Sequence, residues 1–549
     1  MALRPSFRGV GSLLLLGTAC APADRAAPAP ETAPRDQAPA ALSPTELLSR
    51  ASLDLRGVRP SLDELAQVEA NPEAVDALIG SFLHDPRLGE RVRSLFADIY
   101  LTRQDTFSVT AADYGLDDQP AFAAAIGEEP LRILSTIVEE DRPYTEIVTG
   151  DWTVVDEQLG AAWPLDYPAG ETGWRIAHYT DGRPAAGILS TNGFWWRYTS
   201  NASNANRGRA NAISRVLLCS DYLSREIAFE RDVNLLDEAA VTEAIQSNPG
   251  CVACHVTLDP LASYLWGFYY VDAQSRSDTS RYHPERELLW QDATGTAPAY
   301  YGSPGYDLEE LGRQIATDPK LPECITQQVY ERLLQREVTL DDTETLTSLR
   351  ETLIHAELRL RPLFSAVLQS EAYRTAPSDD PSAAPRKLLS PDQLGSVIED
   401  LTGFHFSHLG YDMLRTDTYG LRTLAGGADG LYALRAAKEP TATATLVWAR
   451  VAEGAARYVV TQDQASPLTA RLFTELSLSA TPEADPDGFR RQLHTLHLRV
   501  LGRRIAEDGP EIEANLSLWQ ALYEVEGDPA AAWAGLLSAL LRDPEFLFY

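Results

Sequence analysis

A short helical unit recurs along this chain of 549 residues. The first copy begins around Leu53 to Pro60 and closes on Phe82 to Leu88, and the last begins around Leu498 to Arg504 and closes on Leu540 to Phe546. A weaker middle copy runs from Arg332 to Tyr373. Each copy predicts a helix that ends at Gly or Arg, a polar turn, a second helix, a spacer and a third helix. The repeat therefore favours a mainly α-helical architecture.

Residues at the ends of these helices support the same prediction. Gly57 and Gly502 follow the first helix of the first and last copies, where a left-handed residue favours glycine. Asp85-Pro86 and Asp543-Pro544 fit an N-cap followed by proline at the first helical position. Apolar spacing of three and four predicts further helices in 128–140, 308–315, 345–368 and 444–460. Strand signals are short, as at 146–155.

The first twenty residues have the order of an export signal. Arg4 and Arg8 give a short basic region, Val10 to Leu16 an apolar one, and Gly17-Thr18-Ala19 a run of small residues that ends at Cys20. The last part resembles a lipobox, so we predict a signal peptide at 1–19 and lipidation of Cys20. The alternatives are ordinary cleavage nearby or an uncleaved anchor, but the apolar run is far shorter than the ~20 residues that span a bilayer.

Residues 20–43 alternate Ala, Pro and charged side chains, which predicts a flexible tether between a lipid anchor and the body of the protein. We therefore expect a bacterial cell-envelope lipoprotein, in the outer membrane or periplasm, attached to the membrane through its lipid. Hydrophobic residues make up 44% of the chain, enough for real cores. The net charge of −32 argues against nucleic acid, and against anionic lipid bound by charge alone.

The pentapeptide Cys251-Val252-Ala253-Cys254-His255 has the pattern of c-type haem attachment. Two thiols one helical turn apart can bond to the two vinyl groups on one haem edge, and the adjacent His can then ligate the iron. Attachment takes place outside the cytoplasm, where the export signal sends the chain. Haem c is therefore the expected cofactor, held by Cys251, Cys254 and His255.

Two other uses of this cysteine pair remain open. Cys251 and Cys254 could form a redox-active or structural disulfide, because their spacing allows one. They could also supply half of a zinc site, although no second Cys-x-x-Cys pair completes it. The remaining cysteines of the mature chain, Cys219 and Cys324, fit a disulfide in an oxidising compartment, with buried free thiols as the alternative.

The sequence offers several sixth ligands for a haem iron and selects none. Met413 is the only methionine after the first residue, and His405 and His408 lie close to it in the sequence. A five-coordinate iron, open to peroxide or a small gas, is the other interpretation. The remaining candidates are His84, His178, His283, His355, His494 and His497.

Several blocks between Ser43 and the C-terminus are similar to a known group of proteins. They are Tyr144–Val155, Ala186–Ser190, Asn206–Gly208, Val216–Cys219, Asp259–Leu261 with Phe268, Cys324–Arg336 and Leu541–Phe546. Together they resemble the planctomycete- and myxobacteria-type secreted proteins in which several domains of unknown function surround one c-type haem motif. The resemblance implies an envelope location, a helical multi-domain body and haem, and it supplies no substrate.

The chain departs from that family beside the motif. The family commonly has Gly where this chain has Ala262, and Asp where it has Tyr269. Both positions follow the haem motif, so the departures bear on the surroundings of a haem.

The predicted fold class is mainly α, with several packed helical domains, a repeated three-helix unit and a cytochrome c-like haem segment. We expect domains at 44–165, 166–300 (which contains the haem motif), 301–375 and 387–549, with a linker at 376–386.

Three functions fit these features. The first is electron transfer by an envelope haem protein with a redox partner protein. The second is a haem enzyme or gas sensor with an open axial site. The third is a non-haem binding module with a Cys251–Cys254 disulfide, whose surface would be the aromatic residues around Trp195, although a buried corner is the alternative for those residues. The usual motifs of serine hydrolases, zinc peptidases and P-loop proteins are absent, so the sequence leaves open whether the chain is an enzyme.

Overall fold

Helices form nearly all of the regular structure, as the repeat predicts. The computed structural model describes residues 40–201, 203–225, 234, 236–268, 279–377, 386–506 and 508–549. The predicted signal peptide, Cys20, most of the tether, Tyr269 and most of the predicted linker at 376–386 lie outside these residues. Residues 41–549 form one compact unit.

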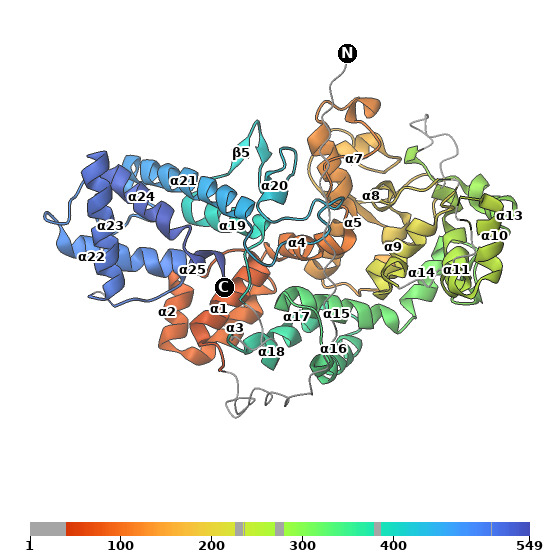
Figure 1. Ribbon diagram of the computed structural model, residues 1–549, viewed down its shortest axis with the longest axis horizontal. Helices are drawn as coiled ribbons and strands as arrows, with labels where there is room; N and C mark the ends of the chain where they lie inside the picture. The colour runs from red at the N-terminus through yellow and green to blue at the C-terminus, as the bar shows by residue number, and fades with distance from the viewer. Residues whose placement is uncertain are drawn as a thin grey trace, which may run out of the picture. The chain divides into compact units, whose positions relative to one another are not determined.

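The N-terminal elements, coloured red to yellow in Figure 1, are helical apart from one pair of short strands. They are α1 (Pro44–Arg56), α2 (Leu62–Ala70), α3 (Val75–Phe82), α4 (Leu88–Tyr100), α5 (Gln119–Glu139), α6 (Glu146–Thr149), β1 (Thr153–Val155), α7 (Glu157–Ala162), β2 (Arg175–Ala177), α8 (Asn192–Arg197) and α9 (Arg207–Leu218). Strands β1 and β2 pair antiparallel, with Val154 opposite Ile176.

The middle of the chain continues with η4 (Tyr222–Ser224), α10 (Glu238–Ser247), α11 (Pro249–Ala262), η5 (Ser263–Phe268), η6 (Pro284–Leu289), α13 (Trp290–Ala293), β3 (Ala299–Tyr300), β4 (Ser303–Pro304), α14 (Leu308–Ala316), α15 (Lys320–Leu334), α16 (Thr343–His355), α17 (Leu360–Gln369) and α18 (Glu371–Arg374). The C-terminal elements are α19 (Pro391–Thr402), β5 (Ser407–His408), β6 (Tyr411–Asp412), α20 (Leu421–Leu424), α21 (Ala442–Ala465), α22 (Pro486–Leu496), the π-helical turn η9 (His497–Leu501), α23 (Pro510–Glu526), α24 (Pro529–Leu540) and α25 (Pro544–Leu547).

The three copies of the repeat share one local design. Their first helices are α1, α15 and α22 with η9, and each ends at a left-handed residue: Gly57 (φ 70°), Gln335 (φ 52°) and Gly502 (φ 69°). The two glycine caps are confirmed, whereas the middle copy places Gln335 in a conformation that favours glycine. Two further helices follow in each copy: α2 and α3, α16 and α17, and α23 and α24.

The two Asp-Pro pairs behave differently. Asp543 caps α25, accepting from the amide of Glu545 at 2.8 Å, as predicted. Asp85 instead lies in a turn, where its carboxylate accepts from the amide of Arg87 at 2.9 Å, and α4 begins only at Leu88. The turn redirects the chain between α3 and α4.

The predicted helices are present, with one division. Residues 128–140, 308–315 and 444–460 fall in or at the end of α5, α14 and α21. The stretch 345–368 is split into α16 and α17, because Glu357 and Leu358 take positive φ angles of 55° and 59° that end the first helix. The stretch 146–155 contains a short helix, α6, before its strand β1.

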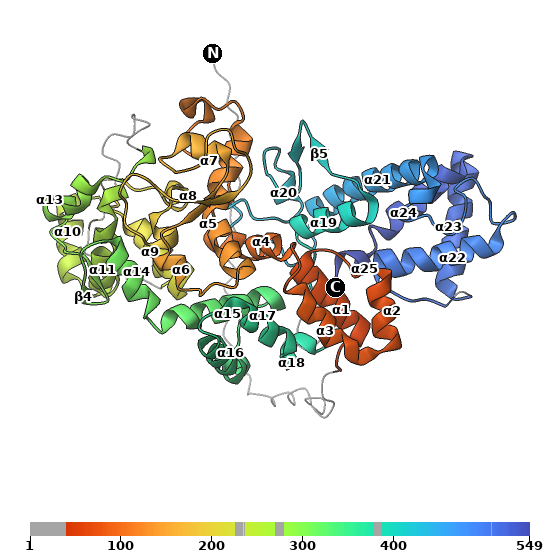
Figure 2. The same ribbon diagram turned by 180° about the vertical axis from the view of Figure 1, so that it is seen from behind.

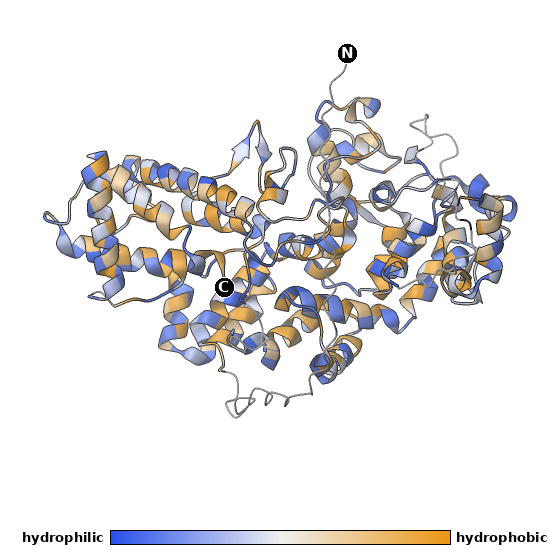
Figure 3. Ribbon diagram, viewed as in Figure 1, coloured by the Kyte–Doolittle hydropathy of each residue, from blue (hydrophilic) through white to orange (hydrophobic). Residues whose placement is uncertain are grey.

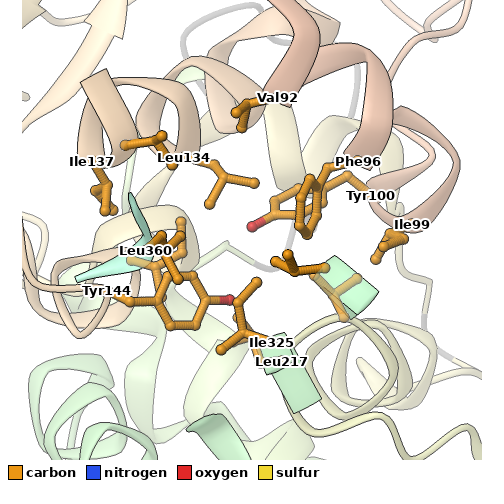
Figure 4. Close-up of a cluster of buried hydrophobic side chains, with 14 of the residues drawn as sticks. Val92, Phe96, Ile99, Tyr100, Leu134, Ile137, Tyr144, Leu217, Ile325 and Leu360 are labelled. Atoms are coloured by element: carbon orange, nitrogen blue, oxygen red, sulfur yellow. The ribbon is translucent and has the colours of Figure 1, made fainter. Parts of the chain in front are cut away.

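A large hydrophobic core lies where α4 packs along α5 (Figures 1 and 2). Hydrophobic and hydrophilic residues alternate around the helices, so each helix has an apolar side to bury (Figure 3). The cluster in Figure 4 draws on five helices: Val92, Phe96, Ile99 and Tyr100 of α4, Leu134 and Ile137 of α5, Leu217 of α9, Ile325 of α15 and Leu360 of α17. No helix among the described residues is both long and apolar enough to cross a bilayer.

A second core packs α19, α21, η9, α24 and α25 together, and Leu53 of α1 belongs to it. A buried polar centre beside Leu53 joins the first helix of the first copy to the end of the middle copy and to the residues that follow the last. Asp54 of α1 accepts hydrogen bonds from Tyr373 of α18 at 2.6 Å and from Tyr549 at 2.8 Å, and forms an ion pair with Lys387. The C-terminus consequently lies beside α1 (Figures 1 and 2).

Candidate functional site

The Cys-x-x-Cys-His motif lies on α11, which begins at a well-formed cap. The side chain of Asn248 accepts from the amide of Gly250 at 2.9 Å, and Pro249 occupies the first helical position. Helix α11 packs mainly on α9, α10, η5 and β3. The cap therefore fixes where α11 begins, two residues before Cys251.

Both thiols of the motif are free and partly buried. Cys251 and Cys254 lie one helical turn apart, on the same side of α11. Cys254 packs against the large core, whereas the neighbouring Val256 is 61% exposed. The pair combines the spacing and the accessibility that thioether attachment needs.

His255 is oriented by a carboxylate one turn further along α11. Its Nδ1 lies 2.8 Å from Oδ1 of Asp259. Arg207 of α9 donates to the same carboxylate through Nε at 2.7 Å and Nη2 at 3.0 Å. An ionised Asp can only accept, so Nδ1 donates this hydrogen bond, and Nε2 is the ring nitrogen that the bond does not use. This is the arrangement that metal-ligating histidines usually show.

Burial and hydrogen bonding act in opposite directions on Asp259. Burial raises the pKa of this carboxyl, but the hydrogen bonds from His255 and Arg207 outweigh it, so the pKa lies below its ordinary value. Asp259 is therefore ionised at neutral pH and holds His255 in one tautomer.

Helix α9 is fixed at both ends. Arg207 ties its first turn to α11, and Cys219 at its C-terminal end forms a disulfide with Cys324 of α15, with the Cα atoms 5.3 Å apart. The pairing expected from the cysteine count is thus present. Tyr222, just beyond α9, also contacts α11 through a 2.8 Å hydrogen bond between its hydroxyl and that of Thr257. The disulfide and these bonds fix α11 relative to α15.

The structure groups three sixth-ligand candidates away from the motif. Met413 is buried, and His405 lies near the carboxylates of Glu399 and Asp412, at 3.7 and 3.6 Å. His408 packs against Tyr419. These residues lie on and around the β5–β6 hairpin, which is not among the main neighbours of α11. No cluster of three metal-binding side chains occurs within the described part of the chain.

Among the other histidines, His283 lies beside the motif's own segment. Its backbone amide donates to the carbonyl of Gly267 at 2.9 Å, and Gly267 belongs to η5, which directly follows α11. Ala262, a departure from the resembled family, is buried at the end of α11.

The aromatic stretch considered as a binding surface is a buried corner. Phe194, Trp195 and Trp196 are buried, and Trp195 donates from its indole to the carbonyl of Leu189 at 2.7 Å. Their burial contradicts the interpretation of this stretch as the surface of a binding module.

Sequence reasoning missed the roles of Arg207 and Glu129. Glu129 of α5 is wholly buried and accepts from Thr153 at 2.8 Å, Tyr179 at 2.7 Å and the amide of Gly193 at 2.7 Å. Burial raises the pKa of Glu129 to about 7, although these hydrogen bonds lower it. Local spacing could have revealed only the contact to which Arg207 is added, because His255 and Asp259 are i,i+4 neighbours on α11.

Comparison of the chain with protein-family models, with curated proteins and with solved structures finds no match to any of them.

Proposed function

We propose that the chain is an envelope c-type haem lipoprotein that transfers electrons to or from a partner protein. The observation that carries the proposal is the arrangement of the two thiols and of His255 in the motif on α11. Cys251 and Cys254 have free thiols one turn apart, and His255 has its Nδ1 engaged by Asp259, so its Nε2 is available to a metal.

The donor set of these residues fits a haem. Two thiols separated by two residues, with an imidazole directly after the second, are the groups that c-type attachment uses. Bound haem would supply one-electron chemistry at its iron. The fit rests on this chain's own hydrogen bonds, because Asp259 and Arg207 are arranged as a supporting shell behind His255.

Each residue has a distinct task in this proposal. Cys251 and Cys254 would hold the group covalently and keep it from dissociating. His255 would supply a nitrogen ligand to its iron, and Asp259 accepts from Nδ1 and holds the ring in one orientation. Arg207 keeps Asp259 ionised and ties α9 to α11. The lipid on Cys20 would retain the protein at the membrane, near a redox partner.

The test is expression in a bacterial host supplied with c-type maturation machinery. We expect haem that survives denaturing electrophoresis and an intact mass increased by one haem. Cys251→Ala with Cys254→Ala should abolish it, whereas the matched control, Cys219→Ala with Cys324→Ala, should retain it. His255→Ala should change the spectrum of any haem retained. Properly matured wild-type protein without covalent haem would refute the proposal.

A haem enzyme or gas sensor is the second candidate. Met413, His405 and His408 lie on and around the β5–β6 hairpin, which is not a main neighbour of α11. Their position favours this function because none of these three candidates is placed to be a second protein ligand of the iron. An open axial position predicts a high-spin reduced spectrum and rapid binding of carbon monoxide. A low-spin reduced spectrum that carbon monoxide leaves unchanged would favour electron transfer instead.

A further inference from the structure

A cavity of about 880 Å³ lies on the side of α9 that carries Ala212 and Arg215. Its walls come from α4, the segment 197–199, α9, the segment 221–224, α15 with residues 335–337, the segment 388–393 and the loop 431–438. The volume falls within the usual range of small-molecule sites, roughly 300–1,000 Å³. The cavity is distinct from the haem motif on α11, although both adjoin α9.

The charge of this cavity is opposite to that of the whole chain. Seven cationic and four acidic side chains line it, whereas the full chain has 47 Lys and Arg against 79 Asp and Glu. The cationic residues are Arg91, Arg197, Arg215, Arg332, Arg336, Arg435 and Lys438. Basic side chains have therefore been concentrated here in an otherwise acidic protein.

Part of this charge is neutralised by ion pairs. Arg332 pairs with Asp98 at 3.1 Å, and Arg435 pairs with Glu337 at 2.9 Å. Arg336 pairs with a carboxylate outside the lining, Asp342, at 2.7 Å. The lining acids Asp98 and Glu337 are therefore already engaged by other cations.

Arg197 and Arg215 have no carboxylate partner among the described residues. Arg197 donates to the carbonyl oxygens of Leu101 and Gly430, both at 2.6 Å, and Arg215 donates to that of Ile99 at 2.6 Å. Burial lowers the pKa of Arg197, and the nearby charge of Arg215 lowers it further. The two guanidinium groups thus repel each other inside the cavity wall.

Tyr198 lies between these two cations. The guanidinium carbon of Arg197 is 4.7 Å from the centre of its ring, and that of Arg215 is 5.9 Å away. Two of the carbonyls they use, those of Ile99 and Leu101, lie at the C-terminal end of α4, which carries only about half an elementary negative charge, and the third, that of Gly430, is a loop carbonyl. The seven lining cations face five carboxylates, the four lining acids and Asp342, so the wall keeps a net positive charge even with Asp221 and Glu331 included.

We propose that this cavity binds a small organic anion that carries carboxylate, phosphate or sulfate groups. Arg197 and Arg215 form its cationic wall, and Lys438, which is exposed, adds a third charge. Arg197 uses Nε and Nη2, and Arg215 uses Nη1 and Nη2, for hydrogen bonds within the protein, so the two side chains would attract such a ligand mainly through their positive charge. The proposal does not depend on haem, because none of the three haem-motif residues lines the cavity.

The test measures binding of citrate and of inorganic phosphate to the full chain by calorimetry at constant ionic strength. We expect binding with one-to-one stoichiometry. Arg215→Gln should weaken it by about tenfold or more, because a partly buried positive charge is removed from the cavity wall. Lys438→Gln should weaken it about threefold, as one nearby charge is removed.

The matched control is Arg457→Gln on α21, which removes the same charge from a side chain that is 74% exposed and outside the cavity. It should bind both anions as the wild type does. Circular dichroism checks that Arg215→Gln is folded, and if it is not, Lys438→Gln decides the matter alone. The proposal is overturned if neither anion binds the wild type, or if Arg457→Gln weakens binding as much as Lys438→Gln.

Discussion

Arg207 of α9 and Asp259 of α11 form a two-point ion pair, with Nε–Oδ1 and Nη2–Oδ2 distances of 2.7 and 3.0 Å. The same carboxylate accepts from His255 at 2.8 Å, so three side chains from two helices form a single chain of hydrogen bonds. Both helices are held elsewhere as well, α9 by the disulfide at Cys219. His255 therefore has little freedom to rotate.

The first prediction concerns this hydrogen bond. If His255 ligates haem iron, Asp259→Asn should raise the reduction potential, on the order of tens of millivolts, because a carboxylate partner makes the ligating imidazole more basic and favours ferric iron. Potentiometric titration followed by absorbance measures the shift. Asp63→Asn on α2 is the control, an exposed acid far along the chain. An unchanged potential in fully loaded Asp259→Asn protein would contradict this role.

The second prediction concerns the disulfide. Cys219 and Cys324 are 105 residues apart. A bridge that closes a loop of that length lowers the conformational entropy of the unfolded chain, which stabilises the folded state by about 4–5 kcal/mol. Cys219→Ser with Cys324→Ser should therefore lower the free energy of unfolding by about 4–5 kcal/mol. Urea denaturation measures it. Cys251→Ser with Cys254→Ser, compared without haem, should change stability little; equal losses in both double variants would argue against a specific role for the bridge.

The third prediction concerns pH. Burial raises the pKa of Glu129 to about 7, above the ordinary value of 4.5. Between these two pH values the folded state binds more protons than the unfolded state, so stability is full below pH 4.5 and is lost as pH rises to 7. The loss is at most about 3.5 kcal/mol, from roughly 1.4 kcal/mol for each pKa unit.

Glu129→Gln should remove this dependence. The melting temperature of the wild type minus that of Glu129→Gln should fall from pH 4.5 to pH 7.5, as followed by calorimetry. Other carboxyls titrate in both proteins and cancel in the difference. A difference that stays flat, or rises, across this range would show that Glu129 keeps an ordinary or lowered pKa.

The fourth prediction concerns export and rests on the sequence alone. We expect the mature chain to begin at a lipidated Cys20. Detergent-extracted protein should show the mass of an acylated N-terminus. The Cys20→Ala variant should be absent from the membrane fraction. Recovery of a soluble, unmodified mature chain from wild-type cells would rule out the anchor.

Local sequence alone determines the helices and several of their ends, without any tertiary contact. Gly57 and Gly502 end their helices because glycine tolerates a positive φ. Asp543 caps α25 because its carboxylate accepts from the amide of Glu545, two residues further on. The spacing of Cys251 and Cys254 likewise placed both thiols on one turn of a helix. Local spacing failed at 345–368, where Glu357 and Leu358 break an otherwise continuous apolar pattern.

The tertiary structure alone decided which distant residues meet. Arg207 and Asp259 are 52 residues apart, and Asp54 receives hydrogen bonds from Tyr373 and Tyr549, 319 and 495 residues away. The cationic cavity beside α9 likewise gathers Arg215 with side chains from several distant segments. No periodicity marks such partners. They are chosen when apolar faces pack and buried charges must find opposite charges or hydrogen bonds, because an unpaired buried charge is too unfavourable to keep.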